Sequence, residues 1–172
     1  MYRVKQFFGA LTARVDEDDE QELAQWLMPS QRDLFRQMAR NDQRHSLDVC
    51  ATLLRAGHAD PDLLTAALLH DAGKAAGRIG LWQRTLVVLL RRWAPGLLNW
   101  LSRGDSIARA PWWRRGFVVN KLHTELGARR AKEAGASPTA VALIRRHQEA
   151  VRAVHDDQDR LLTLLQWADG VN

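Results

Sequence analysis

The sequence predicts an all-α protein, a helical bundle with a basic, Trp-rich helical insert. Apolar residues recur at helical spacing through most of the chain, while alternating runs of β-branched residues and Asn-Gly hairpin turns are absent. The 172 residues are 46% hydrophobic and 26% charged. This length suits one domain of ordinary size with a sizeable core, and the composition excludes disordered, collagen-like and coiled-coil proteins.

The N-terminal part of the chain is expected to form three helices. A short amphipathic helix is expected over residues 3–15, followed by one over 17–28. The second begins with acidic residues, which the helix dipole favours at that end. One long helix is expected over 31–56, where Gly57 ends it.

The next helix has clear signals for its start. Asp60 is a suitable N-cap and Pro61 fits the first turn, so we expect a helix that runs to Gly73. A basic region follows over residues 78–116, and it is interrupted by Pro95-Gly96, Gly104, Pro111 and Gly116. Three further helices are expected over residues 118–135, 138–153 and 158–169, the second with Ser137 as its cap.

The positive charge of the chain is concentrated in its middle. The net charge is +5, yet residues 78–130 alone carry eleven Lys and Arg against Asp105 and Glu125. Such an excess suggests an anionic partner or a solvated arginine-rich surface. Trp82, Trp93, Trp100, Trp112 and Trp113 lie in the same segment.

The sequence also gives expectations about compartment. The single cysteine, Cys50, cannot form an intrachain disulfide and lies in an apolar stretch, so a reducing, cytoplasmic location is expected. The first residues are too weakly apolar for a secretory signal. No uncharged apolar run approaches the length of a membrane-spanning helix.

The sharpest chemical feature is the pair His70-Asp71, at the end of the apolar stretch LLTAALLHDAGK. Burial of a carboxylate there costs several kcal/mol unless the group is paired or binds a metal. Adjacent helical residues diverge by about 100°, so the pair can still straddle one ion at a helix end.

Four more candidate ligands occur in similar contexts. His45 and His147 fall on the apolar faces of their predicted helices, His123 begins an amphipathic stretch, and Asp169 follows the apolar run LLTLLQWA. Each alone is more often a hydrogen-bonded side chain than a ligand. Together, four His and two Asp form a suitable ligand set for two divalent ions such as iron, manganese or zinc.

The order of these residues resembles the HD-domain superfamily of metal-dependent phosphohydrolases. The strings RHSLDVC, ALLHDAGK, LHTELGA, RRHQE and QWADG look like signatures of that family. The resemblance spans residues 31–172, with 78–116 as an insert and 1–30 as an N-terminal helical extension. The extra pair His123 and His147 resembles the binuclear branch of the superfamily, but the GYP part of its cyclic-dinucleotide phosphodiesterases is absent.

The resemblance implies a role for each matching residue. His45, His70, Asp71 and Asp169 would be the core metal ligands, with Asp71 bridging two ions, and His123 and His147 would complete the second site. Lys74 matches the lysine of the HDxxK pattern and would hold a phosphate oxygen. Asp71 and Lys74 are therefore the expected catalytic residues, and one or two divalent ions (Fe, Mn, Zn or Mg) the expected cofactors.

The expected function is hydrolysis of a nucleotide or another small phosphoester by metal-activated water. One alternative is an HD-type di-iron oxygenase, which the same ligand set resembles. Another is a basic helical module that binds nucleic acid or an anionic membrane through residues 78–116. The insert would otherwise be a helical subdomain that covers the site, with Trp in its core and Arg at its rim.

A few residues near the candidate ligands have two readings. Arg44, Arg145 and Arg146 adjoin candidate ligands and either reach the site or belong to the plain surface. His58 and His155 lack an apolar helical context and are expected to be exposed.

Overall fold

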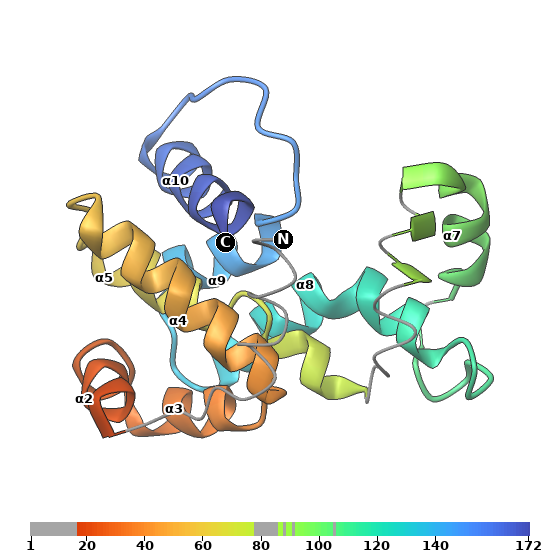
Figure 1. Cartoon of the computed structure of the whole chain (residues 1–172), viewed down its shortest axis with the longest axis horizontal. Coiled ribbons are helices and arrows are strands. Elements are labelled where there is room, and N and C mark those ends of the chain that lie inside the picture. Colours follow the sequence, from red (N-terminus) through yellow and green to blue (C-terminus); the bar gives the residue numbers. More distant parts are fainter. Residues whose placement is uncertain (1–16, 78–85, 88, 91, 105) are drawn as a thin grey trace, which may run out of the picture.

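The computed structural model confirms the all-α prediction, since the part of the chain it describes contains helices and connecting loops without a strand. The structure describes residues 17–77, 86–87, 89–90, 92–104 and 106–172. The helix expected over residues 3–15 lies outside this range. Figure 1 shows the helices in chain order. They are α2 (Glu17–Trp26), α3 (Pro29–Arg36), α4 (Arg40–Arg55), α5 (Pro61–Leu69), the short 3-10 helix η1 (Ala72–Ala76), α7 (Pro95–Leu101), α8 (Arg115–Glu133), α9 (Pro138–Arg146) and α10 (Asp157–Val171).

The single helix expected over residues 31–56 is wrong, because the chain breaks there into α3 and α4. The buried side chain of Gln43 explains the break. Its amide nitrogen lies 3.3, 3.1 and 3.0 Å from the carbonyl oxygens of Phe35, Arg36 and Met38. These carbonyls end α3, so the amide supplies the hydrogen bonds that a continued helix would have made.

The expected boundary signals around Gly57 and Asp60 are confirmed. Gly57 has φ +82°, and the amides of Gly57 and His58 donate back to the carbonyls of Leu54 and Leu53, which is a Schellman end to α4. The Asp60 side chain accepts from the amides of the second and third residues of α5, both at 3.0 Å. Ser137 caps α9 in the same way.

Two expected helices end earlier than the sequence suggested. We expected the helix that begins at Pro61 to reach Gly73, but α5 ends at Leu69 and the chain tightens into η1. Likewise α9 ends at Arg146 rather than near residue 153. In both cases a histidine follows the last helical residue, and its ring hydrogen-bonds to a carbonyl of the last turn, His70 to Ala67 and His147 to Ile144. The chemistry of these rings is described below.

The helices pack around two separate apolar cores. The larger one joins α2 through α5 with α9, α10 and the second half of α8. A much smaller one, Val87, Leu101 and Phe117, holds the region around α7 against the start of α8. In Figure 1, α8 extends from the main bundle to this second lobe. The boundary of an N-terminal extension at residue 30 stays a prediction, although Leu23 and Leu27 belong to the main core.

A close approach of two glycines joins η1 to α8. A Cβ at Gly73 would lie 1.9 Å from the carbonyl oxygen of His123 and 2.7 Å from the amide nitrogen of Gly127. A Cβ at Gly127 would in turn lie 3.1 Å from the Gly73 nitrogen. Only a residue without a side chain fits between these backbones. The glycine that we read as a helix stop therefore sets the distance between the His70-Asp71 corner and α8.

We predict that Gly73→Ala lowers the free energy of unfolding by about 3 kcal/mol, because the new methyl group meets backbone rather than a flexible side chain. The midpoint of thermal unfolding followed by circular dichroism should fall by roughly 6–12 °C. Gly96→Ala is the matched control, since nothing lies within 4 Å of a Cβ built there. Equal melting temperatures for the two variants would contradict the close approach.

Candidate metal centre

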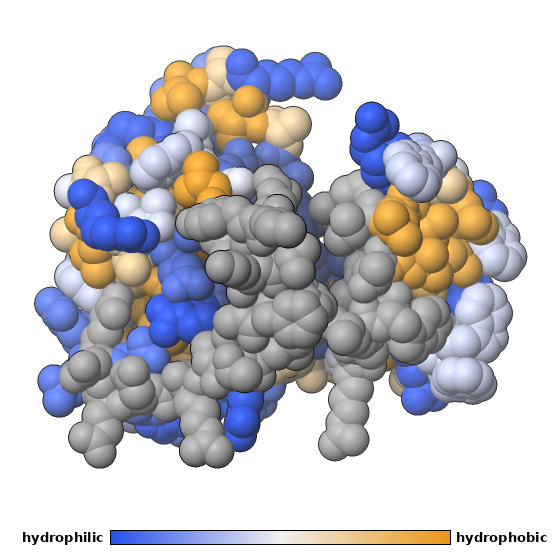
Figure 2. Space-filling view, in the orientation of Figure 1, coloured by the Kyte–Doolittle hydropathy of each residue, from blue (hydrophilic) through white to orange (hydrophobic). Residues whose placement is uncertain are grey.

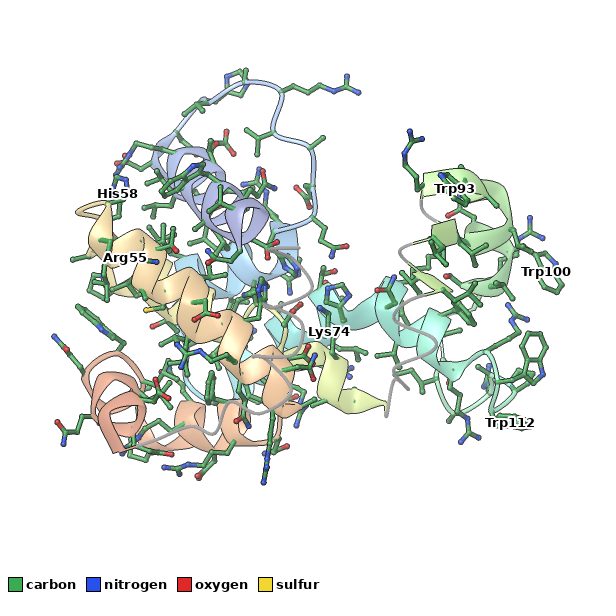
Figure 3. All side chains as sticks on the ribbon, in the orientation of Figure 1. Arg55, His58, Lys74, Trp93, Trp100 and Trp112 are labelled. Carbon is green, nitrogen blue, oxygen red and sulfur yellow. The ribbon has the colours of Figure 1, made fainter. Side chains whose placement is uncertain are left out.

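The structure brings all six predicted metal ligands together from five parts of the chain. His45 lies in α4, His70 and Asp71 form the corner between α5 and η1, and His123 lies in α8. His147 follows the last residue of α9, and Asp169 lies in the last turn of α10. The cluster therefore lies where the helices of the main bundle converge, with Lys74 beside it (Figure 3).

These residues form two adjacent groups of three. One group is His45, His70 and Asp169, and the other is Asp71, His123 and His147. Within each group, one ligand atom from every residue lies within 4.8 Å of the others. The imidazole rings also contact one another across the groups, with a centroid distance of 5.1 Å between His70 and His147. Buried His and Asp side chains in this arrangement can hold a metal ion.

The carboxylate of Asp71 lies between the two groups. Its Oδ2 is 3.6 Å from Nε2 of His70, and its Oδ1 is 3.7 Å from Nε2 of His123. The two oxygens thus face histidines of different groups. This is the orientation that a carboxylate shared by two cations requires.

Three of the four histidines are fixed by the same local interaction. Nδ1 of His70, His123 and His147 lies 2.9, 2.6 and 2.8 Å from the carbonyl oxygen three residues earlier. A carbonyl can only accept, so Nδ1 carries the proton and the neutral ring keeps its lone pair on Nε2. All three Nε2 atoms are therefore prepared as acceptors or metal ligands, which is how metal-binding histidines are usually held.

One of these lone pairs has no partner in the described part of the chain. Nε2 of His70 is buried and makes no hydrogen bond there. Buried polar atoms are nearly always satisfied, so an unsatisfied one needs an explanation. A metal ion bound to His45, His70 and Asp169 would supply it, so the residues present fit the implied cofactor.

His45 and Asp169 form the more open side of the cluster. Nε2 of His45 lies 2.8 Å from Oδ1 of Asp169, and their side chains are 29% and 37% exposed. Asp169 lies close to the end of the printed sequence, where helices often fray. Here the end of α10 is held, because Nδ2 of Asn172 donates to the carbonyl of Ala168 and to Oγ1 of Thr52 on α4.

Lys74 provides the positive charge closest to Asp71. Its ammonium lies 2.5 Å from Oδ2 of Asp71. Burial works to raise the pKa of Asp71, but His70 and His123 in their protonated forms, together with the cationic Lys74, outweigh it and hold this pKa far below its usual range. Asp71 is therefore an ionised carboxylate inside the protein. The negative charge of Asp71 is neutralised here by Lys74, and a bound metal cation could neutralise it in the same way.

The pKa values of the histidines differ across the cluster. Burial lowers the pKa of His147 to about 4, and repulsion from a protonated His70 acts in the same direction. Burial also lowers the pKa of His123. At His45 burial acts in the same direction, but the hydrogen bond with Asp169 and the charge of Asp71 raise its pKa overall. His123 and His147, both buried in the second three-residue group, are therefore neutral at neutral pH, as metal ligation requires.

The arginines that adjoin the candidate ligands form ion pairs with carboxylates outside the cluster. Arg44 pairs with Asp19 and Asp48, and Arg145 pairs with Glu125. Arg146 pairs with Glu149 and Asp159. Each of these arginines therefore has carboxylate partners outside the cluster, which supports the surface reading.

The two remaining histidines stay outside the cluster. His155 is exposed, as expected. His58 is half-buried in the loop after α4, and Figure 3 shows it beside Arg55 at the edge of the molecule, away from Lys74. Cys50 is buried.

Gln148 contacts the cluster and was missed by the sequence analysis. Its amide nitrogen lies 3.3 Å from Nε2 of His123, so it donates to the lone pair that a metal would take. The signal was its position directly after His147, in the string RRHQE. Asn120 was also missed, because its contribution is the backbone carbonyl that holds His123.

Comparison of the chain with protein-family models, with curated proteins and with solved structures gave no match. Among the described helices, none combines the length and the apolar character needed to cross a membrane. The cytoplasmic location stays a prediction.

We predict that the histidines of the metal-free protein titrate in a fixed order as pH falls. His45 gains its proton above pH 6.5, the ordinary histidine value, whereas His147 stays neutral until pH approaches 4. Ring resonances followed by NMR would measure both values. Asp169→Asn should lower the pKa of His45 because it removes the carboxylate charge. Asp48→Asn changes a carboxylate of α4 itself that is paired with Arg44, and it should leave the pKa of His45 unchanged. The reverse order of titration would contradict the electrostatics described here.

Proposed function

We propose that this chain is a metal-dependent phosphohydrolase of the HD type that acts on a nucleotide or another small phosphoester. The observation that carries the proposal is the position of Asp71. Its carboxylate faces a histidine of each three-residue group, and a lysine contacts the same carboxylate. The order of these residues along the chain also resembles the HD superfamily.

The donor set favours certain metals. His45, His70 and Asp169 would hold one ion, His123 and His147 a second, and Asp71 would be shared. Imidazole nitrogen with carboxylate oxygen suits iron, manganese or zinc, whereas magnesium prefers oxygen ligands and retains water. Bound divalent ions would supply Lewis-acid chemistry, which lowers the pKa of water and stabilises negative charge on phosphoryl oxygens.

The protein's own residues would orient the substrate. The side chains of His70, His123 and His147 are buried, while those of His45, Asp169 and Lys74 are 29%, 37% and 23% exposed. A substrate would therefore reach the cluster from the side of His45, Asp169 and Lys74, whose side chains are partly exposed. The Lys74 ammonium would donate to a phosphoryl oxygen and offset the charge that grows in the transition state.

An anionic substrate suits this electrostatic setting better than a neutral one. Lys74 is the cation within hydrogen-bond distance of Asp71, and the chain as a whole carries +5. This favours phosphoester hydrolysis over the oxygenase reaction that the same ligand set resembles.

We predict that Asp71→Ala removes bound metal and abolishes hydrolysis together, because it removes the carboxylate shared by both groups. Metal content is measured by elemental analysis of the purified protein, and hydrolysis with bis-p-nitrophenyl phosphate and p-nitrophenyl phosphate. Two ions per chain are expected in the unchanged protein. Lys74→Gln should keep the metal and lower kcat about a hundredfold. Lys132→Gln, an exposed lysine in the last turn of α8, is the matched control and should change neither quantity.

Two results would overturn this function. The first is hydrolysis that survives in Asp71→Ala after the metal is lost. The second is a protein that contains iron and consumes O₂ with an organic substrate but releases no phosphate from any ester, which would assign the cluster to oxygenase chemistry.

A further inference from the structure

The region around α7 exposes apolar and aromatic side chains that the metal centre does not use. We define the aromatic lobe as residues 86–87, 89–90, 92–104 and 106–114. Of the ten large apolar side chains exposed in the described structure, six lie in this lobe. They are Leu89, Trp93, Leu97, Trp100, Trp112 and Trp113, with exposed fractions from 39% to 78%.

The internal packing of the lobe does not need these side chains. Its core consists of Val87, Leu101 and Phe117, with Leu86, Leu90 and Leu98 packed against it. Arg114 fastens α7 to the start of α8, since its guanidinium donates to the carbonyls of Trp100, Leu101 and Arg103 at 2.9 Å each. The lobe is therefore stabilised by its own small core and by the Arg114 hydrogen bonds, while its tryptophan side chains remain exposed to solvent. The expectation that the tryptophans form the core of this insert is wrong for the four that the structure describes. Trp93, Trp100, Trp112 and Trp113 are 78%, 47%, 76% and 39% exposed, and Trp82 lies outside the described residues.

The exposed aromatic residues lie at the far end of the molecule from the main bundle. In Figure 3, Trp100 and Trp112 project outward from the lobe, at the opposite end from Arg55 and His58, with Lys74 between. Figure 2 shows an apolar surface on the lobe, flanked by hydrophilic residues. A partner bound there would contact the lobe without covering the side chains of the metal centre.

The charged side chains of the lobe as defined, which leaves out Asp105, are all arginines. Arg92, Arg103 and Arg109 are exposed and have no carboxylate partner in the described part of the chain. In the main bundle some arginines, such as Arg36 and Arg146, are paired with acids, whereas Arg129 and Arg152 are exposed and form no ion pair within the described residues. The lobe therefore combines unpaired cations with exposed tryptophan and leucine.

We propose that the aromatic lobe docks this protein on the surface of an anionic lipid bilayer. Tryptophan is favoured at the boundary between headgroups and acyl chains, and leucine gains free energy when it enters that layer. Arginine keeps its guanidinium among anionic headgroups while its stem lies along apolar surface. Since none of the described helices can span a membrane, the contact is peripheral.

Two other occupants fit these residues less well. Stacking of nucleic-acid bases needs open aromatic faces, but the guanidinium of Arg114 lies 5.4 Å from the centroid of the Trp100 ring and 5.9 Å from that of Trp113. Leu89 and Leu97 would also gain nothing from bases. A second copy docked on the same patch would bring arginine against arginine, which costs free energy.

The test is co-sedimentation of the full chain with vesicles. Vesicles of phosphatidylcholine mixed with phosphatidylserine should bind the protein, vesicles of phosphatidylcholine alone should bind it much more weakly, and added salt should weaken the binding. The double variant Arg92→Ser/Arg109→Ser should lower the affinity about thirtyfold, from about fivefold for each cation. The double variant Arg129→Ser/Arg152→Ser removes the same charge from two exposed arginines outside the lobe and should retain nearly full binding.

The apolar part is tested in the same assay. Trp93→Ser/Trp112→Ser should weaken binding about tenfold or more, whereas Trp167→Ser, which changes a 44% exposed tryptophan of α10, should not. Circular dichroism confirms that each variant is folded. Absence of vesicle binding, or equal loss in the lobe and control variants, would overturn the proposal. So would tight binding of single-stranded DNA that Trp93→Ser/Trp112→Ser abolishes, or a dimer in sedimentation that the same variant dissociates.

Discussion

The structure depends on the accommodation of one buried negative charge. Asp71 is almost completely buried, and an unpaired carboxylate in such a place would cost several kcal/mol. His70 and Lys74 lie beside its Oδ2 and His123 lies beside its Oδ1. Four helices and the η1 corner must converge to deliver these groups and their neighbours. The need to pair the buried carboxylate of Asp71 therefore links the packing of the main bundle to the chemistry of the site.

Local backbone geometry determines how the side chains of the cluster converge. Histidine rings held through Nδ1 by a carbonyl of their own helix have little freedom to turn, and three of the four are held this way. The contact of Gly73 with Gly127 then brings the α5 corner against α8. Short local interactions set the direction of each ring, and one close backbone contact sets the distance between them.

Much of this could be predicted from the sequence, because the signals are local. The Asp60-Pro61 and Ser137-Pro138 starts follow from capping chemistry within three residues. The six candidate ligands were found because each is a polar side chain on the apolar face of a predicted helix or at one end of an apolar or amphipathic stretch. The break between α3 and α4 was missed because no proline or glycine marks it. It depends on Gln43, whose amide reaches back five to eight residues, and nothing in its type distinguishes it from a surface glutamine.

The arginines beside the candidate ligands and those of the aromatic lobe differ in their carboxylate partners. The basic excess of the middle segment suggested an anion-attracting cover beside the metal site. The arginines that adjoin the ligands belong to other segments and are paired with carboxylates. Three exposed arginines of the middle segment, Arg92, Arg103 and Arg109, lie on the aromatic lobe and have no carboxylate partner in the described part of the chain. Among the described residues, Lys74 is the cation in contact with Asp71, and this is consistent with the small phosphoester proposed as substrate. The excess charge and the exposed tryptophan share one location, and that shared location is the reason to assign both to one partner that is distinct from the substrate.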